Sequence, residues 1–87
     1  MGFDVVSIQP TPNPNAVKFM LDASIAPQPL SFLHPDQAKA DPLATKLFTV
    51  PGVTSLLLLG DFVTVNKEPS ARWETIQPKV REILKNS

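Results

Sequence analysis

Few side chains in this 87-residue chain can carry acid–base, nucleophilic or metal chemistry. The chain has no Cys, which excludes thiolate nucleophiles and every metal or iron–sulfur site held by cysteines of this chain. Its single His, His34, lies in a proline-rich stretch, and Asp36 and Asp41 follow it. These three side chains can surround a divalent ion, but polar loops often gather such residues by chance. We therefore expect a solvated loop, with no metal ion and no catalytic residue.

Composition excludes several other classes of partner. The three Gly are too far apart for a phosphate-binding loop, and 8 basic residues balance 8 acidic ones to a net charge of zero. No long-range field then attracts nucleic acid or an anionic membrane. The longest apolar run is residues 56–59, against roughly 18 residues for a membrane span, and residues 1–5 lack the basic start of a signal peptide. We expect a soluble, cytoplasmic protein.

Strand patterns predict two hairpins. Residues 3–9 and 16–22 alternate between apolar and polar side chains, and the stiff stretch 10–15 joins them. Residues 53–59 and 62–66 form the second hairpin, with Gly60 and Asp61 at its turn. Residues 23–40 show no sustained period. We expect them to form an irregular surface loop, pinned by its apolar side chains Leu30, Phe32 and Leu33.

Two helices complete the predicted fold. Asp41 is a good N-cap and Pro42 suits the first helical position, while Pro51 and Gly52 end the element. Ser70 is expected to cap the last helix, which continues with a kink through Pro78 and has one apolar face, made of Trp73, Ile76, Val80, Ile83 and Leu84. The order ββαββα predicts a single α+β domain over residues 1–87. It has two layers, with a mainly antiparallel four-stranded sheet and two helices on one face.

The run Leu56 to Leu59 predicts a second apolar surface. Side chains alternate along a strand, so Leu56 and Leu58 must share one face of the sheet while Leu57 and Leu59 share the other. Only one pair can face the helices. Two interpretations stay open for the other pair: residues 23–40 cover it, or a partner docks on it.

The proline-rich connection offers hydrogen-bonding groups at a stiff position. Thr11, Asn13 and Asn15 lie within it and Lys18 follows in the next strand. A rigid loop lowers the ordering cost of recognition, although Asn side chains also close local turns. Pro10, Pro12 and Pro14 can alternatively form a polyproline ligand, but a rigid strand connection is favoured.

Several stretches resemble the N-terminal domain of Nfu/NifU-type iron–sulfur scaffold proteins. Residues 11–19 read TPNPNAVKF, which is similar to the opening signature of that family. Residues 41–48 resemble its SPLAxxLF helix, with Asp in place of Ser. Further similarity lies in Gly52 and Val53, in residues 61–67, which resemble DFxTVxK, and in Trp73 and Pro78. The resemblance covers nearly the whole chain apart from residues 23–40.

The resemblance implies a role linked to iron–sulfur clusters, because family members carry a second domain whose CxxC holds the cluster. This chain ends at Ser87 without a Cys, so we expect no cofactor bound by the chain itself. We expect a non-catalytic accessory or protein–protein interaction module that acts with iron–sulfur assembly or recipient proteins. The residues expected to bind a partner are Thr11, Asn13, Asn15, Lys18, Leu56, Leu57, Leu58, Leu59, Asp61 and Lys67. The alternative is a small metal carrier that uses His34 with Asp36 and Asp41, or the Asn carboxamides.

Overall fold

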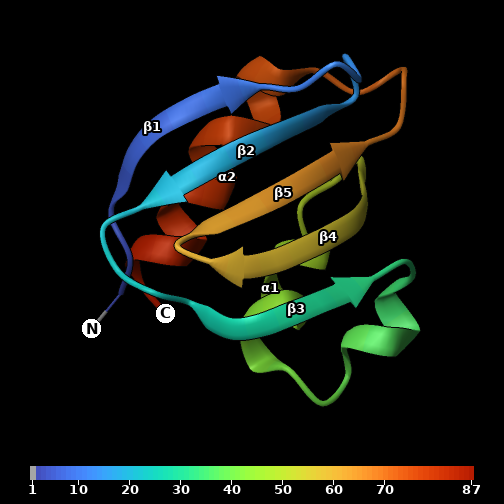
Figure 1. Cartoon of the computed structure of the whole chain (residues 1–87). Coiled ribbons are helices and arrows are strands. Elements are labelled where there is room, and N and C mark those ends of the chain that lie inside the picture. The colour runs from blue at the N-terminus through green and yellow to red at the C-terminus, as the bar shows by residue number, and fades with distance from the viewer. Residues whose placement is uncertain (1) are drawn as a thin grey trace.

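The computed structural model describes residues 2–87 and shows one antiparallel sheet covered by helices on one face. The sheet has five strands in the order β1-β2-β5-β4-β3. In chain order the elements are β1 (Val5–Pro10), β2 (Ala16–Leu21), β3 (Ala26–Phe32), the 3₁₀ turn η1 (Pro35–Ala38), α1 (Pro42–Phe48), β4 (Val53–Gly60), β5 (Phe62–Lys67) and α2 (Trp73–Lys85). Both α-helices lie behind the sheet in Figure 1, so its other face is turned toward the viewer.

The predicted α+β class and its two layers are confirmed, but the sheet has five strands rather than four. The additional strand, β3, comes from residues 23–40, which the sequence predicts as an irregular loop. Leu30 and Phe32 pair with Leu58 and Leu56 of β4. A strand at the edge of a sheet tolerates Pro27 and Pro29, because their missing N–H groups need no neighbour there. Only Ala26 of β3 is buried, so the strand lacks the apolar alternation that would reveal it in the sequence.

The other edge strand, β1, departs from simple alternation. Its register shifts between Val5 and Ser7, so one extra residue is inserted opposite β2. Val5 pairs with Leu21 and Ile8 with Phe19, and both partners belong to the core. Val5 and Ile8 therefore pack on the same side, although simple alternation puts them on opposite faces.

The helix termini follow the sequence at α1 and depart from it at α2. Asp41 Oδ1 accepts hydrogen bonds from the backbone N–H groups of Leu43 and Ala44 at 3.0 and 3.1 Å, as the capping prediction requires. Ser70 does not cap α2: the N-cap position is Arg72, and the Ser70 hydroxyl donates to Glu68 Oε1 at 3.0 Å. Helix α2 does continue through Pro78. Its predicted kink stays a prediction.

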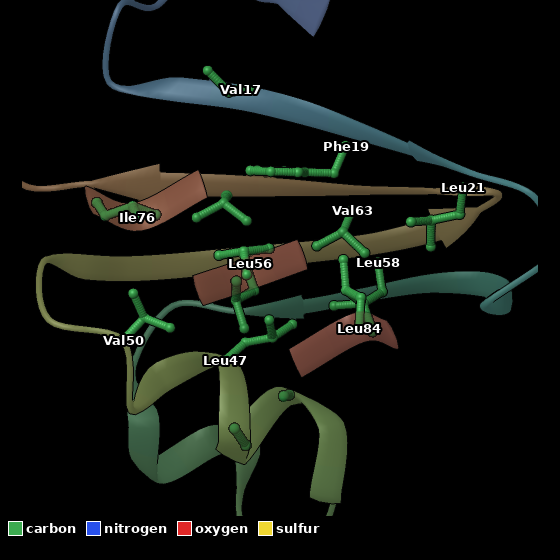
Figure 2. Packing of buried hydrophobic residues seen from close by; sticks show 14 of the residues in the cluster. Val17, Phe19, Leu21, Leu47, Val50, Leu56, Leu58, Val63, Ile76 and Leu84 are labelled. Atoms are coloured by element: carbon green, nitrogen blue, oxygen red, sulfur yellow. The ribbon is translucent and has the colours of Figure 1, made fainter. Parts of the chain in front are cut away.

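The core lies between the sheet and the two helices (Figure 2). Phe19, Leu47, Val63, Val65 and Leu84 have no exposed surface, and Ile76 and Val80 bring the middle of α2 against the strands. The turn between β4 and β5 depends on Gly60, whose φ of 58° is unfavourable for a residue with a Cβ. In residues 2–87 no helix is long and apolar enough to cross a membrane.

Candidate functional site

Several polar groups of the loop at residues 11–15 form hydrogen bonds with one another. Thr11 Oγ1 lies 2.9 Å from the carbonyl oxygens of both Asn13 and Ala16, and it accepts the Asn13 N–H at 3.1 Å. Asn13 Oδ1 in turn accepts the Asn15 N–H at 2.9 Å, which closes a local turn. The Thr11 hydroxyl and the Asn13 carboxamide, which the sequence predicts to bind a partner, thus stabilise the conformation of the loop.

Lys67 and Trp73 fasten this loop to the rest of the molecule. Lys67, at the end of β5, donates from Nζ to Asn15 Oδ1 at 3.0 Å, and its backbone N–H donates to the Asn15 carbonyl at 2.8 Å. The Lys67 ammonium also lies 5.7 Å from the centroid of the Trp73 ring. Trp73 Nε1 donates to the Pro14 carbonyl at 3.1 Å. We call Asn15, Lys67, Trp73 and Pro14 the loop clamp, because they join the loop, β5 and the start of α2.

The four leucines of β4 divide between the two faces of the sheet. Leu56 and Leu58 are each 2% exposed and lie in the core (Figure 2), so they are not available to a partner in the folded chain. Leu57 and Leu59 are half-buried and lie on the opposite face. Residues 26–32 pair along the edge of β4 instead of crossing that face. Within residues 2–87, no segment covers the face turned to the viewer in Figure 1.

Neighbouring strands extend the surface around Leu57 and Leu59. Leu59 pairs with Phe62 of β5, and Phe62 pairs with Met20 of β2, which forms an apolar row across three strands. We call Met20, Leu57, Leu59 and Phe62 the outer apolar patch. All four side chains are half-buried.

Polar residues border the patch. Leu57 pairs with Thr64, and Thr64 pairs with Lys18, whose Nζ lies 4.8 Å from the centroid of the Phe62 ring. Asp61 is exposed at the β4–β5 turn, directly before Phe62. The expected binding residues Lys18, Leu57, Leu59 and Asp61 therefore lie on or beside one surface.

Sequence reasoning missed Met20, Phe62 and Thr64 as members of this surface. Alternation along β2 and β5 contains the signal, because Met20 shares a side with Lys18 and Thr64 shares a side with Phe62. What the sequence alone does not give is the strand order, which puts β5 between β2 and β4 and brings the two sets together.

The candidate metal ligands are not gathered into one site. Asp41 uses its carboxylate to cap α1, and Asp36 lies 3.8 Å from Lys39 in an exposed ion pair. His34 occupies the N-cap position of η1. Across the described residues 2–87, no group of three His, Asp or Glu side chains is placed to hold a metal ion.

Several hollows of the surface lie against α2. One of them is an open depression of about 510 Å³, lined by Phe3, Asp4, Val5, Arg81, Glu82 and Lys85. No polar or charged side chain in residues 2–87 is buried. The geometry thus offers surfaces for binding rather than an enclosed pocket with a desolvated reactive group.

Comparisons with known proteins agree with the architecture. Residues 6–87 match the family described as scaffold protein Nfu/NifU N terminal. The crystal structure of protein SAV1430 from Staphylococcus aureus superposes with a TM-score of 0.80 and 32% identity, over 98% of this chain and 100% of that one. The solution structure of a NifU-like protein from Saccharomyces cerevisiae gives a TM-score of 0.78 and 29% identity, over 90% of this chain and 72% of that one.

Curated relatives extend the comparison to longer proteins. The chain is 35% identical over 81 residues to the mitochondrial NFU1 iron-sulfur cluster scaffold homolog of Drosophila persimilis, and 36% identical to that of Drosophila willistoni. Each match covers 91% of this chain but only 29% and 28% of the relatives, so the chain spans under a third of their length. The match over residues 6–87, together with the shared fold, shows that this chain belongs to the Nfu/NifU N-terminal family.

Proposed function

We propose that this chain is a non-catalytic protein-interaction module that works in iron–sulfur cluster assembly. The observation that carries the proposal is the outer apolar patch, formed by Met20, Leu57, Leu59 and Phe62 on the sheet face opposite the helices. Family membership supplies the context, since the Drosophila relatives are named as iron-sulfur cluster scaffold homologs.

An interaction role follows from how the two faces of the sheet are used. The helices α1 and α2 cover the centre of the inner face, where side chains such as Phe19 and Val63 have no contact with solvent. The outer face presents apolar side chains in the same strands, yet none of residues 2–87 folds over them. Apolar groups grouped on an open face contribute binding free energy when a partner removes them from water.

The partners that we propose are iron–sulfur assembly proteins or the proteins that receive clusters. Thiolates are the usual ligands of iron–sulfur clusters, and these 87 residues contain none. A cluster handled alongside this module would therefore be bound by another domain or protein. We keep the cytoplasm as the predicted compartment, although the Drosophila relatives are designated mitochondrial.

Affinity capture from cells of the source organism tests the proposal. The intact chain should co-purify with iron–sulfur assembly or recipient proteins, and the double variant Leu57→Thr with Leu59→Thr should lose them. Leu33→Thr is the matched control, because Leu33 is 63% exposed and lies away from the sheet face. Capture without any iron–sulfur protein would contradict the proposed role. If the double variant captures these proteins as well as the intact chain does, the outer apolar patch is not their binding site.

A further inference from the structure

The outer apolar patch has the width of one α-helix. Its side chains come from three adjacent strands, β2, β5 and β4. Neighbouring strands lie about 4.8 Å apart, so the patch is about 10 Å wide, which is close to the diameter of a helix with its side chains. Leu57 and Leu59 are separated along β4 by about 7 Å, a spacing that side chains one helical turn apart can cover.

The edges of the sheet are poor places for a partner strand. The free edge of β3 contains Pro27 and Pro29, which have no N–H to donate. On the opposite edge, β1 carries a register shift between Val5 and Ser7 and ends at Pro10. Prolines and bulges both interrupt the regular row of donors and acceptors that strand addition needs. A partner is therefore expected on the face of the sheet rather than at its edges.

A second copy of this chain is a weaker fit than a short partner element. Stable dimers bury roughly 800 Å² on each subunit. The outer apolar patch contains four side chains, all of them already half-buried by their neighbours. A patch of this size matches a single docked helix better than a sheet-on-sheet interface.

Charges at one end of the patch set the chemistry of the partner. Asp22 follows Met20 by two residues, just beyond the end of β2, and lies near Asp61 because the Leu21 N–H donates to the Asp61 carbonyl at 2.7 Å. Asp22 Oδ1 accepts the Asp4 N–H at 3.1 Å, which leaves its second carboxylate oxygen for a partner. Asp61 directly precedes Phe62 in the β4–β5 turn. Both aspartates are exposed, and the one ion pair found among residues 2–87 is elsewhere, between Lys39 and Asp36.

We propose that this face binds a basic amphipathic α-helix of a partner protein. The apolar stripe of the helix covers Met20, Leu57, Leu59 and Phe62, and its Lys or Arg side chains meet Asp22 and Asp61. Lys18 lies one row further from these aspartates, and its ammonium donates to a carboxylate at the other end of the helix. This assignment rests on the proposed function, which supplies the interaction role but not the chemistry of the partner.

A pair of synthetic peptides tests the assignment on the intact chain. Both are helical, about 16 residues long with one shared apolar stripe, and they carry either Lys or Glu at the positions facing the aspartates. In NMR titrations the Lys peptide should shift the backbone amides of Met20, Leu57, Leu59 and Phe62. It should bind about 10-fold more tightly than the Glu peptide, and added salt should reduce the difference.

Matched variants locate the charge contribution. Asp22→Asn with Asp61→Asn should weaken the Lys peptide about 10-fold, whereas Asp36→Asn, in the exposed ion pair with Lys39, should leave it unchanged. Absence of shifts on the outer face, equal binding of the two peptides, or dimerisation of the free chain through this face would overturn the proposal. The capture experiment separates the two ideas. If the Lys peptide binds but no iron–sulfur protein is captured, only the proposed role in iron–sulfur assembly is contradicted. If iron–sulfur proteins are captured but the Lys and Glu peptides bind equally, only the basic helix is contradicted.

Discussion

The loop at residues 11–15 and the outer face of the sheet use their side chains in opposite ways. The sequence predicts that residues of both regions bind a partner. In the folded chain, Thr11, Asn13 and Asn15 direct their polar groups to the loop itself and to Lys67. Leu57 and Leu59 gain no covering element from residues 2–87.

The difference suggests a contrast between a distinctive motif that stabilises the fold and a plain apolar run that we propose as a binding surface. A hydrogen-bonding group finds partners locally, because backbone N–H and C=O groups are always near. An apolar side chain on a sheet face can be removed from water only by another element or another molecule. We therefore propose that the loop contributes to stability and the outer face to binding, and four predictions test this contrast.

Truncation of an inward leucine should have the largest effect. Leu58→Ala removes a core side chain that is 2% exposed and should reduce the free energy of unfolding by about 2–5 kcal/mol. Leu57→Ala, one residue away on the outer face, should cost less than about 1 kcal/mol. Urea unfolding measures both. Equal losses would show that the outer face is covered and is not a docking surface.

Removal of the indole at the loop clamp comes next. Trp73→Ala should cost about 2–4 kcal/mol, below the value for a fully buried Trp, because the ring is half-buried and also donates to the Pro14 carbonyl. Trp73→Phe keeps an aromatic ring over Lys67 and should lose only about 1 kcal/mol for the missing hydrogen bond. Thermal unfolding of the two variants separates packing from hydrogen bonding. An unchanged melting temperature for Trp73→Ala would show that the clamp does not hold α2.

Loss of the Asn15 carboxamide should have a smaller effect. Asn15→Ala leaves the partly buried Lys67 ammonium without its side-chain acceptor and should cost about 1–2 kcal/mol. A double-mutant cycle with Lys67→Met should give a coupling of about 0.5–1 kcal/mol, since the two groups share one hydrogen bond. If Asn15→Ala instead is as stable as the wild type but no longer captures iron–sulfur proteins, the loop is part of the binding surface.

The outer pair should have the smallest effect on stability. Leu57→Thr with Leu59→Thr introduces β-branched residues that suit a strand, and the free energy of unfolding should change by less than about 1 kcal/mol. Partner capture and binding of the Lys peptide should both fall. A large loss of stability in this variant would show that Leu57 and Leu59 pack as core residues. The two faces of the sheet would then not differ in the way proposed.

Local patterns predicted those elements whose cause is also local. Asp41 followed by Pro42 identified the start of α1, and the spacing of Ile76, Val80 and Leu84 identified the buried stripe of α2. Gly60 identified the turn between β4 and β5 through its positive φ. Each depends on contacts within a few residues, so the sequence contains the whole argument. Ser70 shows the limit, because a suitable capping residue bonded to Glu68 instead.

The sequence by itself determined the α+β class, both helices, the two hairpins and the division of the four leucines into two opposed pairs, because each follows from side-chain periodicity or turn chemistry. Tertiary structure decided the rest. Pairing with β4 made an edge strand from residues 26–32, and the position of β5 between β2 and β4 brought Met20 and Phe62 beside Leu59. Packing of α1 and α2 chose Leu56 and Leu58 as the buried pair. These outcomes depend on contacts between segments far apart in the chain, and local periodicity does not record which segments become neighbours.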